Sequence, residues 1–166
     1  MKSIFVFTGD APATPWKSTN DGVMGGLSEG AAILDDEGMI FSGNLSLENN
    51  GGFSWIHQKG DFDLSEFEGV RFQIKGDGRA YQLRLQTDAR FRIWGQVAFS
   101  KEFTTVPDEW LDVFVPFAEL NQSWRGRQLS GYEFDPAEIE RIGFILADKK
   151  PGPFRMTVGW LGAAND

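Results

Sequence analysis

The chain of 166 residues has no cysteine and a single histidine, His57. Without cysteine there is no disulfide scaffold, no thiolate zinc site and no cysteine nucleophile. One histidine excludes a multi-histidine metal site, and no acidic partner for His57 is apparent in the sequence. We therefore expect neither a catalytic residue nor a bound metal.

Basic residues are also scarce, and long apolar runs are absent. The 24 acidic and 16 basic residues give a formal net charge of −8, and the resulting field repels polyanions such as nucleic acid. No apolar run approaches the roughly 18 residues of a membrane-spanning helix, and the one in MKSIFVFTGD is too short for a signal peptide. We expect no nucleic-acid partner, no membrane span and a cytoplasmic location.

The chain does have a strong alternation of apolar and polar residues. With 41% hydrophobic residues, including 15 Phe and 6 Trp, it can fill the core of one domain over residues 1–166. Period-two alternation predicts half-buried strands at 40–47, 52–58, 70–75, 80–87, 94–103, 111–117, 141–147 and 154–160. Short strands with turn signals between them predict an all-β fold, an antiparallel β-sandwich or jelly roll. The one helix expected covers residues 135–142, with Asp135 as N-cap.

The glycine-rich stretch STNDGVMGGLSEG, residues 18–30, resembles a ligand loop only loosely. It lacks the Lys-Ser/Thr pair of a phosphate loop and the spacing of a dinucleotide fingerprint, so we expect no cofactor. Its oxygen ligands are too sparse for calcium. We interpret it as a structural loop in which glycines take positive φ and Val23 and Met24 fill the core. Asn20 and Asp21 are the polar residues that can also line a site there.

A second stretch, IKGDGRAYQLRLQ, predicts a hairpin with its turn at Asp77-Gly78. That pairing puts the polar side chains of both strands on one face: Arg71, Lys75, Gln82, Arg84 and Gln86. Such a face can grip an anionic or hydroxyl-rich partner, because guanidinium groups donate hydrogen bonds in a fixed geometry. The alternative is a solvated sheet face.

Two further segments carry charge beside turn residues. In NQSWRGRQLSGYEF, residues 121–134, we expect a long loop in which Trp124 flanked by Arg125 and Arg127 is an interface anchor, a sugar platform or a plug for the core. In ADKKPGPFRM, residues 147–156, Asp148 and Lys149 precede a Pro-Gly-Pro turn that predicts a hairpin between two core strands.

Five motifs taken in order resemble the domain of the complex I intermediate-associated protein family, from about Trp16 to Trp160. They are NDGVMGGLS, FSGNLSLENNGGFSW, VRFQIKGDGRAYQLRLQT, WRGR and RIGFILADKKPGPFRM. The resemblance implies a galactose-binding-domain-like jelly roll and no established catalytic residues. It implies a role in assembling respiratory complex I, NADH:ubiquinone oxidoreductase, through its partly built intermediates. The absence of a visible transit peptide suggests similarity to a free-standing bacterial-type member.

The family's motif positions fall on residues 20–26 and 28, 51–53, 76–79 and 81, 125–127, 148–149 and 152–154. The leading hypothesis is therefore a non-enzymatic protein-interaction module whose partners are complex I subunits or assembly intermediates. The candidate partner- or ligand-binding residues are Asn20, Asp21, Arg71, Arg79, Tyr81, Arg84, Trp124, Arg125, Arg127, Asp148 and Lys149.

The alternative hypothesis is a carbohydrate-binding module of the jelly-roll type, with a glycan as partner. Its stacking platforms would be Trp55, Trp94, Trp124 and Tyr81, and Arg71, Arg84 and Gln86 would bond hydroxyl groups. A third hypothesis, an enzyme acting on a small molecule or a nucleotide-linked reductase, lacks a dinucleotide fingerprint in this chain.

Overall fold

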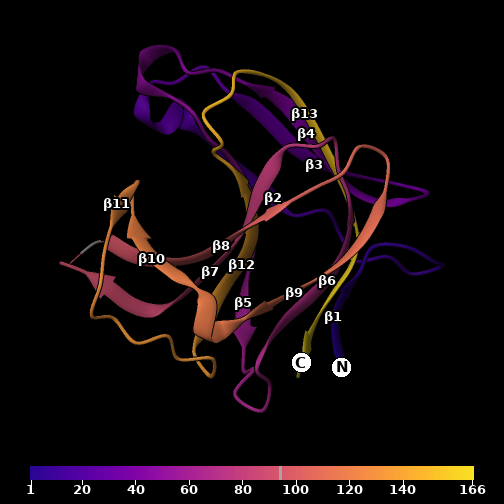
Figure 1. Cartoon of the computed structure of the whole chain (residues 1–166), viewed down its shortest axis with the longest axis vertical. Coiled ribbons are helices and arrows are strands. Elements are labelled where there is room, and N and C mark those ends of the chain that lie inside the picture. The colour runs from indigo at the N-terminus through magenta and orange to yellow at the C-terminus, as the bar shows by residue number, and fades with distance from the viewer. Residues whose placement is uncertain (94) are drawn as a thin grey trace.

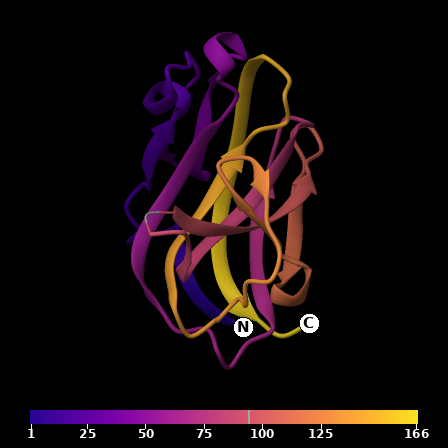
Figure 2. The same cartoon turned by 90° about the vertical axis from the view of Figure 1, so that its left-hand side faces the viewer.

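Two antiparallel β-sheets pack face to face in the computed structural model (Figures 1 and 2). The structure describes residues 1–93 and 95–166, without the side chains of Val23, Met24 and Asn50. The termini lie together at one end of the sandwich (Figure 1), where Lys2 pairs with Ala163. The prediction of an all-β antiparallel sandwich is confirmed.

The six-stranded sheet has the order β3-β4-β13-β6-β9, with β1 added beside β13. Its strands are β1 (Lys2–Val6), β3 (Glu29–Asp35), β4 (Gly38–Leu45), β6 (Gly69–Lys75), β9 (Trp110–Pro116) and β13 (Gly152–Ala164). Strand β13, yellow in Figure 2, runs along the length of the sandwich.

The seven-stranded sheet has the order β11-β10-β8-β7-β12-β5-β2. Its strands are β2 (Lys17–Asn20), β5 (Ser54–Phe62), β7 (Ala80–Phe91), β8 (Gly95–Thr104), β10 (Asn121–Trp124), β11 (Arg127–Gln128) and β12 (Ile139–Leu146). Three short 3-10 turns, η1 (Asp21–Met24), η2 (Glu48–Asn50) and η3 (Phe117–Glu119), complete the regular structure of the described residues.

The core lies between the two sheets and is built by the alternation seen in the sequence. In β7, Tyr81, Leu83 and Leu85 are fully buried, whereas Gln82 and Arg84 point away from the core. Aromatic rings join the sheets: the ring of Phe72 in β6 lies 5.0 Å from that of Phe103 in β8 and 5.1 Å from that of Phe144 in β12. Both contacts are edge-to-face, an arrangement that aromatic pairs favour.

Two local predictions differ from the structure. Residues 135–142 form no helix: Asp135 accepts hydrogen bonds from the backbone N–H groups of Ala137 and Glu138 in a single turn, and β12 begins at Ile139. An Asp-Pro pair initiates a turn as readily as a helix. Residues 121–128 form a short hairpin, β10–β11, rather than part of a loop. Arg125 and Gly126 both have positive φ, as tight hairpin turns require.

The two predicted hairpins at Asp77-Gly78 and Pro151-Gly152 are wrong. Strands β6 and β7 belong to different sheets, and so do β12 and β13, so each connection crosses from one sheet to the other. A hairpin and a crossover both present an apolar face to the same core, so period-two alternation does not distinguish them. Consequently Arg71 lies on the outer face of the six-stranded sheet and Arg84 on that of the seven-stranded sheet.

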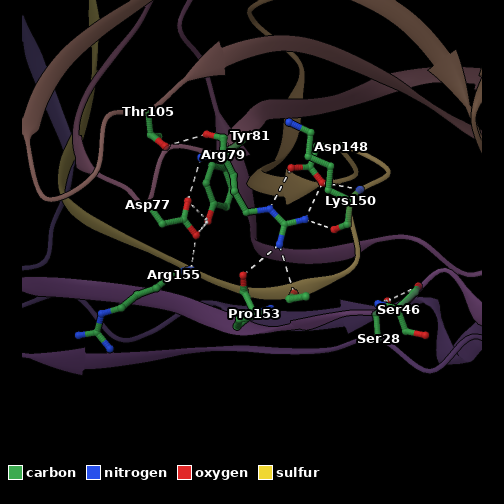
Figure 3. A network of polar contacts seen from close by, with 11 residues as sticks. Ser28, Ser46, Asp77, Arg79, Tyr81, Thr105, Asp148, Lys150, Pro153 and Arg155 are labelled. Carbon is green, nitrogen blue, oxygen red and sulfur yellow. Dashed lines mark hydrogen bonds and ion pairs between the residues drawn. The ribbon is translucent and has the colours of Figure 1, made fainter.

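A buried ion pair ties the two crossovers together (Figure 3). The guanidinium of Arg79 donates from Nε and Nη2 to the carboxylate of Asp148, at 2.9 and 2.7 Å, and from Nη1 to the carbonyl oxygens of Gly152 and Pro153. The side chains of Arg79 and Asp148 are only 13% and 7% exposed. Although burial opposes ionisation, the bond from Arg79 holds the pKa of Asp148 below its usual range.

Replacing Arg79 by alanine should cost about 3–5 kcal/mol of unfolding free energy, because it leaves the Asp148 carboxylate buried and unpaired. The matched control is Arg71→Ala, which breaks an ion pair with Asp112 whose side chains are 30% and 54% exposed. The control should cost at most about 1 kcal/mol. Urea denaturation of both variants checks this, and equal small losses would contradict the account.

Candidate functional site

The glycine-rich loop is organised around a buried aspartate. Asp21 is fully buried, and its carboxylate accepts hydrogen bonds from Ser28 (N at 2.9 Å, Oγ at 2.5 Å) and from the backbone N–H groups of Gly52 and Phe53. Burial opposes ionisation, but these bonds outweigh it and lower the pKa of Asp21. The carboxylate therefore braces residues 21–28 against the chain entering β5.

The neighbouring Asn20 is also used inside the chain. Its amide nitrogen donates to the carbonyl of Gly30, and its amide oxygen accepts from the hydroxyl of Ser54 at 2.5 Å. This placement favours the architectural interpretation of the loop, and ligand binding by Asn20 and Asp21 stays a prediction. Core filling by Val23 and Met24 falls on side chains outside the described residues.

Asp21→Ala should lower the unfolding free energy by about 3 kcal/mol or more, because several buried N–H donors lose their acceptor and each costs roughly 1–3 kcal/mol. Asp36→Ala, in an exposed turn, is the control and should change little. Thermal and urea unfolding of the two variants test this. An unchanged Tm for Asp21→Ala would refute the bracing role.

Three other candidates, Arg79, Tyr81 and Asp148, belong to the network that joins the crossovers (Figure 3). The Tyr81 ring is fully buried and its hydroxyl donates to Asp77, so the ring is no stacking platform. Next to them, Lys149 is exposed and has a φ of 63°. Of this group, Lys149 alone is presented to solvent.

Trp124, Arg125 and Arg127, together with Phe91, form a cluster at the β10–β11 edge of the seven-stranded sheet, here called the edge cluster. The Trp124 ring lies 5.1 Å from the Phe91 ring. It also packs closely against Gly95: a Cβ atom at position 95 would lie 2.4 Å from Nε1 of Trp124. The guanidinium of Arg125 lies 5.1 Å from the Trp124 ring, and that of Arg127 lies 5.4 Å from the Phe91 ring. Both arginines are exposed around a half-buried aromatic pair.

A second group gathers on the outer face of the seven-stranded sheet, near its centre, and is called the outer-face cluster: Trp55, His57, Arg84, Ser100 and Arg141. Strand register brings these residues together, since Arg84 lies opposite both Ser100 and Gly143, and Gly143 lies opposite His57. The guanidinium groups of Arg84 and Arg141 lie 5.4 and 5.8 Å from the Trp55 ring. The His57 ring lies 4.3 Å from the same indole.

Hydrogen bonds fix the protonation of His57. Its Nδ1 faces Nη1 of Arg141 at 3.4 Å, and because a guanidinium only donates, Nδ1 accepts. The proton of the neutral ring then sits on Nε2, which lies 2.9 Å from Oγ1 of Thr19 and donates to it. Burial, with the nearby charges of Arg141 and Lys17, lowers the pKa of His57 to about 4. Imidazole is therefore neutral at physiological pH.

This neutral histidine makes stability depend on pH. Because the pKa of His57 falls from its usual 6.5 to about 4 on folding, the unfolded chain binds a proton that the folded chain excludes. Stability should be full above pH 6.5 and decline towards pH 4. The decline from this residue should be at most about 3 kcal/mol, since a tenfold change in proton affinity is about 1.4 kcal/mol. Urea denaturation across this range should give a flatter profile for His57→Gln; identical profiles would contradict the assignment.

The structure separates most residues named for sugar binding. Trp55, Arg84 and Gln86 share the outer face of the seven-stranded sheet, but Tyr81 lies in the core and Arg71 on the opposite sheet. Trp124 lies in the edge cluster, and Trp94 lies outside the described residues. Sequence reasoning missed Ser100 and Arg141, because alternation gives the outward side of a strand but not its neighbours.

Two further observations concern ions and membranes. Over residues 1–93 and 95–166, no three histidine, aspartate or glutamate side chains gather closely enough to hold a metal ion. Within the same part of the chain, none of the helices has the length and apolar character needed to traverse a lipid bilayer.

Comparison with known sequences gives one family. A model of the family described as complex I intermediate-associated protein 30 matches residues 5–158. The mouse mitochondrial protein of that name is 29% identical over 114 residues, which are 67% of this chain and 34% of the relative. A probable mitochondrial counterpart from Caenorhabditis elegans is 25% identical over 160 residues, 85% of this chain and 47% of the relative. The chain thus spans between a third and a half of the length of these relatives.

The solved structures of similar fold include several carbohydrate-binding modules. The family 11 module of a Clostridium thermocellum cellulosomal cellulase superposes with a TM-score of 0.68 at 16% identity, covering 99% of this chain and 96% of the module. A family 30 module gives a TM-score of 0.63 at 15% identity, covering 99% and 89%. At such identities the likeness shows the fold alone, an antiparallel β-sandwich of two sheets.

Proposed function

Because the chain belongs to the complex I intermediate-associated protein 30 family, we propose that it is a non-enzymatic protein-interaction module that assists the assembly of respiratory complex I. The match of the family model over residues 5–158 carries the proposal. The partners are complex I subunits or partly assembled intermediates. A cytoplasmic location stays a prediction from the sequence.

Three titratable side chains, those of Asp21, Asp148 and His57, are already bonded to other groups of the chain, which supports a role in binding rather than in catalysis. The carboxylate of Asp21 is saturated by backbone and hydroxyl donors, and that of Asp148 is paired with Arg79. His57 is neutral, 7% exposed and held between Thr19 and Arg141. General acid–base catalysis needs such a group within reach of a substrate, and here each is engaged by the fold.

The edge cluster has the composition of an interface anchor. Trp and Arg are enriched among the residues that dominate binding energy in protein interfaces. Arg125 and Arg127 are exposed, and the packed rings of Trp124 and Phe91 hold the turn that carries them. A positively charged anchor also suits a chain of net charge −8, because it gives a local attraction for an acidic partner.

Affinity capture tests the proposal. The tagged chain, crosslinked briefly in gently solubilised lysate of its own host, should enrich NADH:ubiquinone oxidoreductase subunits over an unrelated jelly-roll control. The double variant Arg125→Ala with Arg127→Ala should retain the wild-type Tm and lose roughly tenfold in capture, as expected for a charged hot spot of 1.4 kcal/mol or more.

The matched control is Lys150→Ala with Arg155→Ala, which removes two exposed cations near the crossovers and should capture as wild type does. Absence of complex I subunits from the wild-type capture would reject the assembly role. Their retention by the Arg125/Arg127 variant would reject the edge cluster as the contact.

A further inference from the structure

Three buried polar atoms without a hydrogen-bond partner lie on one face of the molecule. In the described part of the chain, the buried side-chain nitrogens and oxygens that lack a partner are Nε1 of Trp16, Nε1 of Trp55, Nε of Arg84 and Oγ of Ser100. Trp16 belongs to the core, but the other three all belong to the outer-face cluster. Orphaned buried donors are rare in native proteins, and each costs stability.

Register and contacts bring the three groups to one place. Arg84 lies directly opposite Ser100 on β8 and opposite Gly143 on β12. The indole of Trp55 packs against Gly143: a Cβ atom at position 143 would lie 2.5 Å from Nε1 of Trp55. The missing side chain of Gly143 therefore gives the indole N–H its place beside the guanidinium of Arg84.

The guanidinium of Arg84 has no counter-ion among the described residues. Burial lowers the pKa of Arg84 to about 10, and no neighbouring charge offsets that effect. The group stays protonated at neutral pH. Two other partly buried arginines do have a counter-ion: Arg79 is paired with Asp148, and Arg71 with Asp112. Glu140, close by on β12, is already engaged by Arg90 and Gln96.

The surroundings of Arg84 carry several further cations, and also a carboxylate, Glu102, which lies opposite Gln82 on the same side of β8 as Ser100. Arg141 lies over the same indole as Arg84, and Lys17 and Lys59 sit opposite His57 and Arg141 in the register. Arginine and tryptophan side chains can only donate hydrogen bonds, and the serine hydroxyl can donate as well. Together they favour an acceptor, and the unpaired charge of Arg84 favours one that is negatively charged.

We propose that the outer-face cluster is a carboxylate-binding site that receives an aspartate or glutamate side chain of a protein partner. Arg84 is the principal residue that binds this carboxylate. A guanidinium matches a carboxylate in bidentate geometry, and such charge-assisted bonds are about twice as strong as neutral ones. The choice of a protein partner rests on the proposed function, whereas the carboxylate chemistry rests on the cluster itself.

A side-chain carboxylate fits this cluster better than a sugar ring does. A pyranose stacks on an exposed aromatic face, but Trp55 is only 8% exposed and its ring is occupied by Arg84, Arg141 and His57. What the cluster offers is a set of hydrogen-bond donors, and its two arginines, Arg84 and Arg141, are only half-buried, so that part of each side chain is accessible to a partner.

Nuclear magnetic resonance titration of the full chain tests the site. The probe is a short acetylated and amidated peptide with a central run of glutamates, and its control has glutamines instead. The Nε–H signal of Arg84 and the indole N–H signal of Trp55 should shift saturably with the glutamate peptide and stay in place with the glutamine peptide. The affinity should fall as sodium chloride is raised.

Two variants separate binding from structure. Arg84→Met should weaken glutamate-peptide binding by at least about tenfold, in line with the loss of a charge-assisted hydrogen bond. It should also raise Tm, because it removes an unpartnered buried charge. The matched control Arg71→Met, on the opposite sheet, should bind the peptide as wild type does.

Unshifted wild-type signals at saturating glutamate peptide would overturn the proposal, whether or not Arg84→Met folds. Shifts produced by polygalacturonate but not by the peptide would identify an acidic sugar as the ligand and overturn it too. A lower Tm for Arg84→Met, with unaltered peptide binding, would make Arg84 a structural residue. The synthetic peptide keeps this test separate from the test of the assembly role. The chain can capture complex I subunits without binding the peptide, and it can bind the peptide without capturing complex I subunits.

Discussion

The packing of aromatic rings between the two sheets is the interaction on which the rest of the structure depends. Phe72 on one sheet meets Phe103 and Phe144 on the other, and Tyr81, Phe41 and Phe154 extend the same layer. Burying a ring of this size is worth roughly 1.5–3 kcal/mol, so the layer supplies much of the favourable free energy. Because each strand turns its apolar side chains towards this layer, the polar side chains of the strand lie on the outer face of the six-stranded or of the seven-stranded sheet.

The alternation in the sequence was sufficient to predict the strands and the sandwich, but not the connections. Segments such as 70–75 and 80–87 are strands as predicted, yet the turn between them crosses from one sheet to the other. The choice between hairpin and crossover depends on contacts such as Arg79 with Asp148, which are 69 residues apart. The helix predicted from Asp135-Pro136 failed because the apolar periodicity that follows belongs to a strand.

The sequence allowed some residues of the candidate site to be predicted, but not which of them lie next to one another. Arg84 and Trp55 were named from the sequence, but their meeting with Ser100 and Arg141 depends on the strand order β8-β7-β12-β5. Five candidates of the glycine-rich loop and the crossovers have side chains that are hydrogen-bonded within the chain: Asn20, Asp21, Arg79, Tyr81 and Asp148. The two outer clusters differ from them, because Arg84, Arg125 and Arg127 face outward. Both clusters belong to the seven-stranded sheet, which we infer to be the binding side of the molecule.

The measurement that tests this inference most directly is hydrogen–deuterium exchange of the chain, alone and with a purified partly assembled complex I from the same host. Our account predicts slower exchange on binding in β5, β7 and β12 and in the turn at 125–127, with the outer strands of the six-stranded sheet unchanged. Protection confined to the six-stranded sheet, or no protection at all, would contradict it.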